Sequence, residues 1–520
     1  MSQKKLARNI SVMSIAVFLS RILGLVRDQV MAYFFGGGYL NDAFNVAYNI
    51  PNLLRRLFGE GALSTAFVPI YNEIGIKADN KRQIEFALNV LSILTLFLLL
   101  ITFIGIIFAP QIVSLLYPGL APETAEIAIK LTRIMFPYLF FIGLSSTFIA
   151  ILNSHEYFFM TGLSSALLNI GMMLCILIPH FILRLPAESL IYPAGWGVAI
   201  GGLLQTAINF PYLKRIGYRF RILLNFGSEA LGTMWKRFVP ALIGIGIREI
   251  NLIADALMAS FLPIGSITAL GYGNRLMQLP LGIFAISAGT AVLPMYSRLV
   301  SKGEYSELSD SMRFTTLNLA YIMLPITALI LTLSEDFIRI LFAHGAFDEL
   351  AVLMSSQALS YYSIGLLFYS MNQVMTPLFY AKGDTKTPVK LAATMVGLNI
   401  LLNYILMQVL QHRGLALSTS ITAIVNYLLL MTLIKRSFPE IVFRGISSSL
   451  LKSAAISVAI YFISIYIKSS LPWETRGGLI LRSAIIGSVG MLFFYGMGMI
   501  LKLQYLKEAG ENLWKRLQHR

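Results

Sequence analysis

Five arginines of this sequence lie inside long apolar stretches, where a permanent charge needs a physical reason: Arg21, Arg27, Arg55, Arg56 and Arg275. The acidic residues near them are fewer, namely Asp28, Asp42 and Glu60. Because positive charges outnumber negative ones, we expect part of this set to bind an anion. Guanidinium groups suit phosphate and diphosphate, since their planar fork donates two parallel hydrogen bonds to neighbouring oxygens.

Ion pairs within the protein are the alternative explanation for some of these charges. Arg21 and Asp28 are seven residues apart, which places both on one face of a helix, and Arg56 and Glu60 have the i,i+4 spacing of a helical ion pair. A structural role is expected for the other charges in such stretches, which are Arg248 (seven residues before Asp255), Lys130 and Arg133.

The stretches that carry these charges are long and apolar enough to cross a membrane. Of the 520 residues, 57% are hydrophobic and 13% are charged, so a water-soluble fold of this size would expose large apolar patches. A spanning helix needs about 20 predominantly apolar residues, and residues 91–110 carry no charge. We predict an all-α polytopic membrane protein with about fourteen spans, at 9–35, 41–70, 84–109, 124–152, 160–179, 191–212, 231–260, 266–297, 312–332, 351–380, 387–409, 414–434, 450–467 and 479–501.

The distribution of basic residues predicts the orientation of these spans. Most Lys and Arg residues outside the predicted spans lie in alternate loops, together with both termini. The positive-inside rule then places both termini in the cytoplasm, and it explains the net charge of +16 without a nucleic-acid partner. The longest polar stretch, 214–238, is one of these cytoplasmic loops. Its second half, SEALGTMWKRF, is expected to lie on the membrane surface as an amphipathic helix.

An internal repeat relates the first six predicted spans to the next six. Asp28-x-x-Met-Ala recurs as Asp255-x-x-Met-Ala, AFVPIY at 66–71 recurs as AVLPMY at 291–296, and further short matches follow in the same order. Six is an even number, so the copies share one orientation and are related by a pseudo-two-fold axis normal to the membrane, as in secondary transporters. The predicted lobes are 1–225 and 226–440, and 441–520 adds two C-terminal helices and a cytoplasmic tail.

Motifs for other kinds of chemistry are missing from the sequence. It contains no G-x-x-x-x-G-K-[ST] loop and no H-E-x-x-H site, and its single cysteine, Cys175, lies in an apolar run. We therefore expect a transporter without an ATP motor rather than an enzyme. Two other classes were weighed: a lipid-linked glycosyltransferase, which typically needs a sizeable loop for its acidic or metal-binding site, and a scaffold whose buried arginines are purely structural.

Four segments strongly resemble the MurJ (MviN) lipid II flippases. They are SRILGLVRD (20–28), NDAFNVAYNIPNLLRRLFGEGALSTAFVPIY (41–71), GNRLMQLPLGIF (273–284) and KGDTKTPVK (382–390). The resemblance covers both repeats, and the stretch NIPNLLRRLFGEGA is quite specific. That family also has fourteen spans, and it belongs to a superfamily that includes the MATE multidrug exporters and the polysaccharide-lipid exporters.

The resemblance implies a function and a site. It implies that the chain moves lipid II, the undecaprenyl-diphosphate-linked precursor of peptidoglycan, from the cytoplasmic to the periplasmic leaflet of the bacterial inner membrane. Spans thirteen and fourteen are implied to form a groove for the lipid tail. Asn49 and Asn274 depart from a lysine and an acid that some relatives carry. The family's basic cavity residues correspond here to Arg21, Arg27, Arg55, Arg56 and Arg275, with Asp28 beside them and with Asp42 and Glu60 expected in gating or ion pairing.

The expected mechanism is alternating access driven by membrane potential or an ion gradient, with the chain acting as a monomer among membrane lipids. Arg27 and Arg275 are expected to clasp the diphosphate, while Asp28 orients Arg27. Some members of the family bind sodium, and the spacing lets Asp255 join Asn399, Asn403 and Thr419 as oxygen ligands. The alternative is that Asp255 pairs with Arg248 and that the asparagines hydrogen-bond between helices.

Two further transport functions stay open from the sequence. One is a flippase for another polyprenyl-diphosphate-linked glycan, which would use the same arginines. The other is a cation-coupled exporter of the MATE type, whose cavity should be acidic and aromatic. No cofactor other than sodium is expected.

Overall fold

The described part of the chain is predominantly helical. The computed structural model describes residues 3–57, 62–442 and 445–506, and it leaves out the side chains of 3–17, 62, 159–160, 243–245, 247 and 248. No β-strand occurs among these described residues. Contacts divide the chain into two compact units: unit 1 is Met1–Ile267 with His344–Asp348, and unit 2 is Thr268–Ala343 with Glu349–Arg520.

Unit 1 is a bundle whose buried side chains form two apolar clusters. The first lies among α2, α6, α8 and α9 and includes Phe44, Leu131 and Met172. The second lies among α3, α4 and α7 and includes Phe67, Phe86 and Phe148. The helices are α1 (Gln3–Phe35), α2 (Tyr39–Arg55), α3 (Ala62–Lys77), α4 (Asn80–Ile107), α5 (Ala109–Leu116), α6 (Pro122–Met135), α7 (Pro137–Ser154), α8 (Phe158–Leu183), η2 (Ala187–Leu190), α9 (Ile191–Ala207), α10 (Phe210–Arg215) and α11 (Glu229–Ala259).

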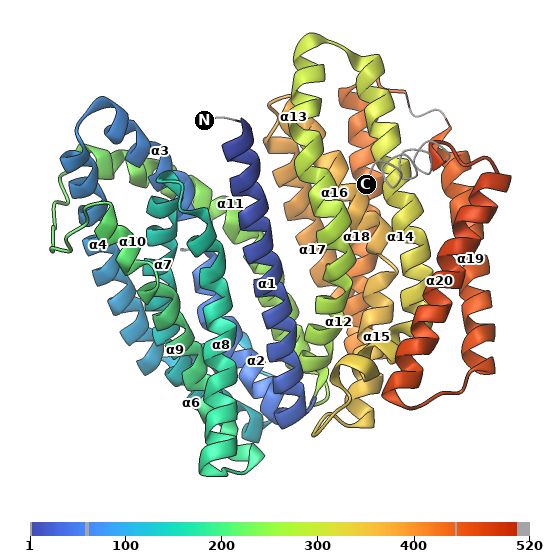
Figure 1. Ribbon diagram of the computed structural model, residues 1–520, viewed down its shortest axis with the longest axis horizontal. Coiled ribbons are helices and arrows are strands. Elements are labelled where there is room, and N and C mark those ends of the chain that lie inside the picture. The colour runs from blue at the N-terminus through green and yellow to red at the C-terminus, as the bar shows by residue number, and fades with distance from the viewer. Residues whose placement is uncertain (1–2, 58–61, 443–444, 507–520) are drawn as a thin grey trace. The chain divides into compact units, whose positions relative to one another are not determined.

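Glycines bring α8 and α9 of unit 1 into close contact (Figure 1). A Cβ added to Gly197 would lie 2.7 Å from the Cα of Met172, and one added to Gly171 would lie 2.8 Å from the Cα of Gly201. Small residues let helix backbones approach closely in a membrane, where the hydrophobic effect does not drive helices together. The α8–α9 pair is therefore a rigid wall of unit 1, and α1 packs against α8.

Unit 2 has a core in which the last two helices pack on α14 (Figure 1). Leu317, Leu333, Ile460, Ile486 and Phe494 are buried in it. The helices are α12 (Ser266–Pro280), the π-helical turn η3 (Leu281–Ile286), α13 (Ser287–Lys302), α14 (Tyr305–Phe342), α15 (Glu349–Ser363), α16 (Leu366–Ala381), α17 (Lys386–Leu410), α18 (His412–Ser437), α19 (Ile446–Ser470) and α20 (Arg476–Ile500).

Each predicted span overlaps one described helix or a run of consecutive helices, and the span predicted at 41–70 also includes residues 58–61, which lie outside the described part of the chain. Breaks occur at prolines in several places: α7 begins at Pro137, and Pro280 precedes the π-helical turn. Proline lacks an N–H donor and clashes with the preceding turn, so the regular hydrogen-bond ladder stops there. The sequence marks these elements correctly as long apolar segments, but it does not show that they are interrupted.

Nine described helices are long and apolar enough to cross a membrane, and counting the bent pair α15 and α16 as one span makes ten. The all-α multi-pass fold is therefore confirmed, whereas the number fourteen stays a prediction. The two numbers differ because some predicted spans are interrupted helices and others are short helices. For example, α9 has only 17 residues, whereas a regular span needs roughly 20.

The contact-based division differs from the repeat-based one. Helix α11 packs against α3 and belongs to unit 1, although the repeat assigns its span to the second lobe. Contacts show which helices pack together, whereas the repeat shows which segments resemble each other in sequence. The lobe boundaries at 225 and 440 and the pseudo-two-fold axis therefore stay predictions. The helix expected in 228–238 is present, but residues 229–238 form the first turns of the continuous helix α11 instead of a separate helix. Its location on the membrane surface stays a prediction.

The turn before α17 yields a prediction about acid sensitivity. Asp384 accepts hydrogen bonds from the backbone N–H groups of Lys386 and Thr387, each at 3.0 Å. The hydrogen bonds from Thr387 lower the pKa of this carboxyl below its usual value of 3.8. Its stabilising effect is therefore complete above the unfolded-state pKa and is lost as the pH falls through the lower folded-state pKa. We expect Asp384→Ala to reduce the acid dependence of the melting temperature, measured between about pH 3 and pH 7.

The control for this experiment is Glu307→Ala, on the exposed first turn of α14. A melting temperature of Asp384→Ala with the same acid dependence as the parent protein would refute the capping role.

Candidate functional site

Arg27 and Asp28 form a buried ion pair on α1. The Nε and Nη2 atoms of Arg27 donate to Oδ1 of Asp28 at 3.1 and 2.7 Å, and the residues are 8% and 5% exposed. The Nη1 atom lies 3.9 Å from the sulfur of Met172 on α8. Asp28 thus fixes the orientation of the Arg27 guanidinium in an apolar wall, and the carboxylate partly balances its charge.

Arg21 and Arg275 are exposed, in contrast to Arg27. Arg21 lies on α1 of unit 1, and Arg275 lies on α12 of unit 2. An exposed guanidinium at membrane depth faces water, a polar cavity or an anion rather than lipid tails, because contact with hydrocarbon costs several kcal/mol. Both positions are consistent with contact to a polar ligand.

Arg55 and Arg56 lie at the C-terminal end of α2 and are partly buried. The Nε atom of Arg55 donates to Oδ1 of Asn52 at 2.6 Å. The Nε atom of Arg56 lies 2.8 Å from Oε2 of Glu249 on α11, whose side chain is 4% exposed. Glu60, the partner expected for Arg56 from its spacing, lies outside the described residues. Sequence spacing finds partners within one helix, and for this reason it missed Glu249.

The pair between Arg56 and Glu249 is expected to stabilise unit 1. Arg56→Ala would leave the Glu249 carboxylate buried without this partner, and a hydrogen bond to a charged group contributes about 1.5–3 kcal/mol. Because the Arg56 side chain is 29% exposed, we expect the lower end of that range. Thermal unfolding of the purified protein tests this.

Glu249→Gln serves as the comparison, since it keeps an acceptor for Arg56 while it removes the buried charge. If Arg56→Ala melts at the same temperature as Glu249→Gln and the parent protein, the pair contributes nothing measurable.

Asp42 connects the start of α2 to the loop before α12. Its Oδ2 atom accepts a hydrogen bond of 2.6 Å from the backbone N–H of Gly265, and Asp42 is 4% exposed. Gly265 has a φ of +90°, a conformation that glycine adopts without steric cost. Nearby, the backbone N–H of Ala346 donates to the carbonyl of Tyr33 at 2.8 Å. These bonds hold the end of α1, the start of α2 and two loops together within unit 1.

Gly36 and Gly345 permit this close packing. A Cβ on Gly36 would lie 2.3 Å from the carbonyl oxygen of Ala346, and one on Gly345 would lie 2.3 Å from that of Tyr33. Both glycines have positive φ, at +63° and +64°. The GGG turn at 36–38 in the sequence therefore contributes a loop-to-loop contact as well as a turn.

The residues predicted for a sodium site lie in both units. In unit 1, Asp255 accepts a hydrogen bond of 3.1 Å from Asn251; the side chain of Arg248, its alternative partner, lies outside the described residues. In unit 2, Asn403 donates to Asn399 at 3.1 Å, and Ser418 donates to Asn403. Thr419 donates to the backbone of its own helix. The asparagines, 2% and 0% exposed, thus belong to a hydrogen-bonded network between α17 and α18.

Sequence reasoning missed a buried charge cluster in unit 2. Asp336 on α14 is 1% exposed and accepts hydrogen bonds from Nε and Nη2 of Arg482 on α20, at 2.9 and 2.8 Å. Lys468 on α19 lies 3.1 Å from the same carboxylate. The predicted span ended at residue 332, before Asp336, because charges follow; α14 in fact continues to Phe342.

Lys130 and Arg133, which the sequence favours as structural charges, lie on α6. Lys130 forms an exposed i,i+4 ion pair with Glu126 at 2.6 Å, and Arg133 is exposed.

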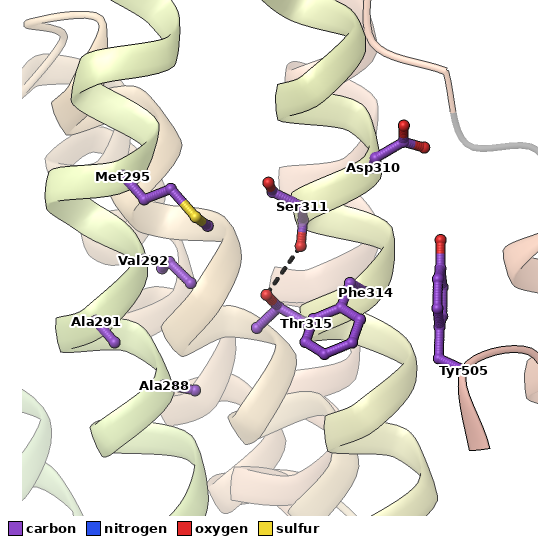
Figure 2. A pocket seen from close by; sticks show the side chains of 9 residues that line it. All are labelled: Ala288, Ala291, Val292, Met295, Asp310, Ser311, Phe314, Thr315 and Tyr505. Carbon is purple, nitrogen blue, oxygen red and sulfur yellow. Dashed lines mark hydrogen bonds between the residues drawn. The ribbon is translucent and has the colours of Figure 1, made fainter. Parts of the chain in front are cut away.

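A cavity of about 480 Å³ opens within unit 2 between α13 and α14 (Figure 2). Small and apolar side chains of α13 form one wall, and Tyr505, after the end of α20, lies at its edge. Tyr505 packs edge-on against Phe314 with ring centroids 5.3 Å apart, and Arg313 donates to Gln504 at 3.0 Å. The lining residues are Ala288, Ala291, Val292, Met295, Asp310, Ser311, Phe314, Thr315 and Tyr505.

Comparison with known proteins decides the family. The family model described as Lipid II flippase MurJ matches residues 31–476. A probable lipid II flippase MurJ of Buchnera aphidicola subsp. Acyrthosiphon pisum is 36% identical over 425 residues, which cover 80% of this chain and 81% of the relative. The chain belongs to the MurJ lipid II flippase family. A probable MurJ of Rickettsia prowazekii is 31% identical over 95% of this chain and 97% of its own length.

Solved structures agree with membership of the MurJ family. A lipid II flippase MurJ in an inward closed conformation superposes with a TM-score of 0.78, with 28% identity over 94% of this chain and 98% of that chain. A MATE-family multidrug transporter in an inward-facing conformation gives a TM-score of 0.66 at 15% identity, over 82% of this chain and 98% of that chain. The second likeness shows a shared fold alone. MurJ proteins are lipid-transporting membrane proteins rather than enzymes, and the resemblance stated from sequence motifs is confirmed.

Proposed function

We propose that this chain moves lipid II from the cytoplasmic to the periplasmic leaflet of a bacterial inner membrane. The observation that carries the proposal is the buried pair of Arg27 and Asp28 on α1, in a chain that belongs to the MurJ family. A guanidinium inside a membrane segment has a high free-energy cost, which favours a functional role for Arg27. Asp28 holds this guanidinium in a fixed orientation. The relatives that are named as lipid II flippases supply the substrate class.

The arginines recognise the diphosphate in this proposal. Arg27 and Arg275 bind its oxygens during transport, and Asp28 both orients Arg27 and limits how tightly the anion is held. Arg21, Arg55 and Arg56 add positive charge along the path of the headgroup. A bidentate guanidinium contact suits a diphosphate better than a single ammonium does, because two N–H groups meet two oxygens at once.

The polyprenyl tail stays among apolar side chains. The α13 side of the cavity between α13 and α14 is small and apolar, which suits such a chain, whereas Asp310, Ser311 and Thr315 make the α14 side partly polar. Tyr505, after α20, reaches its edge. Within this proposal, α19 and α20 form the groove that guides the tail along unit 2.

Alternating access moves the headgroup across the membrane. The hydrogen bond between Asp42 and Gly265 lies within unit 1, directly before α12, the helix in which the chain passes from unit 1 to unit 2. We assign Asp42 to gating because this bond holds the segment that leads into unit 2. Glu60 lies outside the described residues, and its assignment to gating or ion pairing rests on the resemblance of the motif at 41–71 alone. Asp42→Ala is therefore expected to change the balance between conformations more than the affinity for lipid II.

Membrane potential or an ion gradient drives the cycle. Moving one charge through 100 mV provides about 2.3 kcal/mol. We assign sodium to Asp255, Asn399, Asn403 and Thr419, because each offers the hard oxygen donors that such a cation prefers. Both termini lie in the cytoplasm, and the protein acts as a monomer.

Depletion of the protein in its own bacterium tests the proposed function. Cells without it should accumulate lipid II in the cytoplasmic leaflet, measured as lipid II protected from a membrane-impermeant periplasmic enzyme. Re-expression should restore exposure. If another undecaprenyl-diphosphate-linked glycan accumulates instead, the substrate is that glycan; if only drug efflux changes, the chain works as a MATE-like exporter.

A further inference from the structure

Residues 219–226 of unit 1 form an extended segment that hydrogen bonds and an ion pair hold against α4. Asn89 on α4 donates to the carbonyl of Asn225 at 2.9 Å and accepts from its N–H at 2.8 Å. The N–H of Leu223 donates to Ser92 at 3.0 Å, and Arg221 pairs with Glu85 at 2.8 Å. Three side chains of one helix thus hold a strand-like segment in a defined position.

The fastened segment presents apolar side chains outward at every second position. Phe220, Ile222, Leu224 and Phe226 are 49%, 82%, 47% and 68% exposed. Alternation places successive side chains on opposite sides of an extended backbone, and the intervening residues 221, 223 and 225 make the bonds to α4. A row of four large exposed apolar side chains in an ordered loop marks an interaction surface.

The segment lies near the inner edge of the hydrocarbon core. Helix α4 has 28 residues, so it is about 42 Å long, roughly 12 Å longer than the hydrocarbon core of about 30 Å. If its end at Ile107 marks the outer boundary, the inner boundary falls about 20 residues earlier, near Asn89. Residues 223 and 225 bond to Ser92 and Asn89, which places the apolar row at that level.

The apolar row continues the lipid-facing surface of α4. From Leu96 onward, large apolar side chains of this helix are exposed, including Leu99, Leu100 and Phe103 at 48%, 58% and 64%. Phe220 also packs against Phe210, with ring centroids 5.2 Å apart. The segment therefore extends an existing apolar surface instead of forming an isolated patch.

Exposed basic residues flank the row in the sequence. Between residues 214 and 237 they outnumber the acids, since Glu229 is the one acidic residue there, while Glu85 of α4 pairs with Arg221 and Glu73 of α3 interacts with Arg237. Long basic side chains place their charge among headgroups while their stems stay in apolar surroundings, and anionic lipids attract such clusters. The basic residues are Lys214, Arg215, Arg219, Arg221, Lys236 and Arg237.

We propose that residues 219–226 are a membrane anchor that inserts Ile222, Leu224 and Phe226 into the cytoplasmic leaflet, where the surrounding cations bind the headgroups of anionic phospholipids. The anchor fixes the depth of unit 1 in the bilayer without a further transmembrane helix. A peptide partner that adds to the exposed strand is the competing occupant. The position of the segment near the inner edge of the hydrocarbon core and the basic residues beside it favour the lipid as the occupant. This anchoring role does not depend on which substrate the protein carries.

Site-directed spin labelling of the full chain tests the anchor. Cys175 is replaced by serine, and a nitroxide is attached at position 222 or 224 of protein in lipid nanodiscs of phosphatidylcholine with or without phosphatidylglycerol. We expect both labels to be relaxed more by oxygen than by a water-soluble nickel chelate, and the difference to grow with phosphatidylglycerol. A label at Ser306, on the exposed first turn of α14, should show the opposite preference.

Variants that lack two of the basic side chains test whether anionic headgroups bind here. Arg215→Gln with Arg219→Gln should reduce the effect of phosphatidylglycerol while the melting temperature stays unchanged, because neither side chain makes the bonds to α4. Labels at 222 and 224 that are as accessible to nickel as the label at Ser306 would overturn the proposal. Insertion that is equal in both lipids would overturn the assignment to anionic headgroups.

Discussion

Arg27→Ala is expected to lower lipid II transport by about ten- to a hundred-fold, because a charge-assisted hydrogen bond is worth about 1.5–3 kcal/mol. Arg27→Lys should recover only a small part of the activity. Lysine keeps the charge, but it cannot donate two parallel hydrogen bonds to a diphosphate. The measurement is lipid II transfer between leaflets at equal amounts of folded protein, with initial rates compared among the three proteins.

The loss must be separated from a folding defect, since Arg27 is also the partner of the buried Asp28. Arg27→Ala with Asp28→Ala removes both charges and so restores neutrality in the apolar wall. We expect this double variant to melt at a temperature close to that of the parent protein and to remain inactive in lipid II transport. Arg133→Ala, an exposed arginine on α6, is the matched control and should transport normally. Full transport by stably folded Arg27→Ala would remove Arg27 from the substrate site.

Arg482→Leu is expected to destabilise the protein by about 3–5 kcal/mol, because it leaves the Asp336 carboxylate in a buried site without its bidentate partner. Lys468 remains beside Asp336, but its side chain is 27% exposed, and its ammonium group is shared with the carbonyl of Thr332 and with Glu335. Thermal unfolding of the purified protein measures the change. Lys468→Met should have a clearly smaller effect than Arg482→Leu.

The double variant Asp336→Leu with Arg482→Leu distinguishes an ion pair from a packing defect. Removal of both charges avoids the uncompensated carboxylate, so the double variant should melt above the Arg482→Leu single variant. If the double variant loses as much stability as the sum of two single variants, the two residues act independently and the cluster does not fasten α20 to α14.

The apolar elements of the fold follow closely from the sequence. The charge-free run at 91–110 lies mostly in α4, and each predicted span overlaps one described helix or a run of consecutive helices. The exact ends do not follow, because an apolar pattern stops at a charge even when the helix continues. Asp336 shows this: its charge is neutralised by residues of α19 and α20, about 130 to 150 positions later in the chain.

Part of the candidate site could also be predicted from the sequence. The excess of arginines over acids identified Arg27 as an unusual residue, and the structure shows it buried beside Asp28. The pairing of Arg56 with Glu249 was not predictable from spacing, since its two residues lie on different helices. Contacts that depend on tertiary structure, such as that between Asp42 and the N–H of Gly265, leave no pattern in a single sequence.

The role proposed for residues 219–226 could not be predicted from the sequence. The sequence of this segment, RFRILLNF at 219–226, is short, has basic residues only at its first and third positions, and carries no recognisable motif. Its meaning depends on Asn89 and Ser92, which hold the segment against α4. Without these contacts, the same residues would be a flexible basic loop.

Reconstitution of the purified chain in vesicles measures directly whether the protein moves lipid II and whether Arg27 is needed for it. The protein is placed in vesicles that carry labelled lipid II, and an impermeant reagent that modifies only the outer leaflet measures how fast lipid II crosses the bilayer. We expect the rate of crossing to rise in proportion to the amount of protein and to fall at least about ten-fold for Arg27→Ala. Crossing no faster than in protein-free vesicles, under an imposed membrane potential and a sodium gradient, would contradict the proposed function.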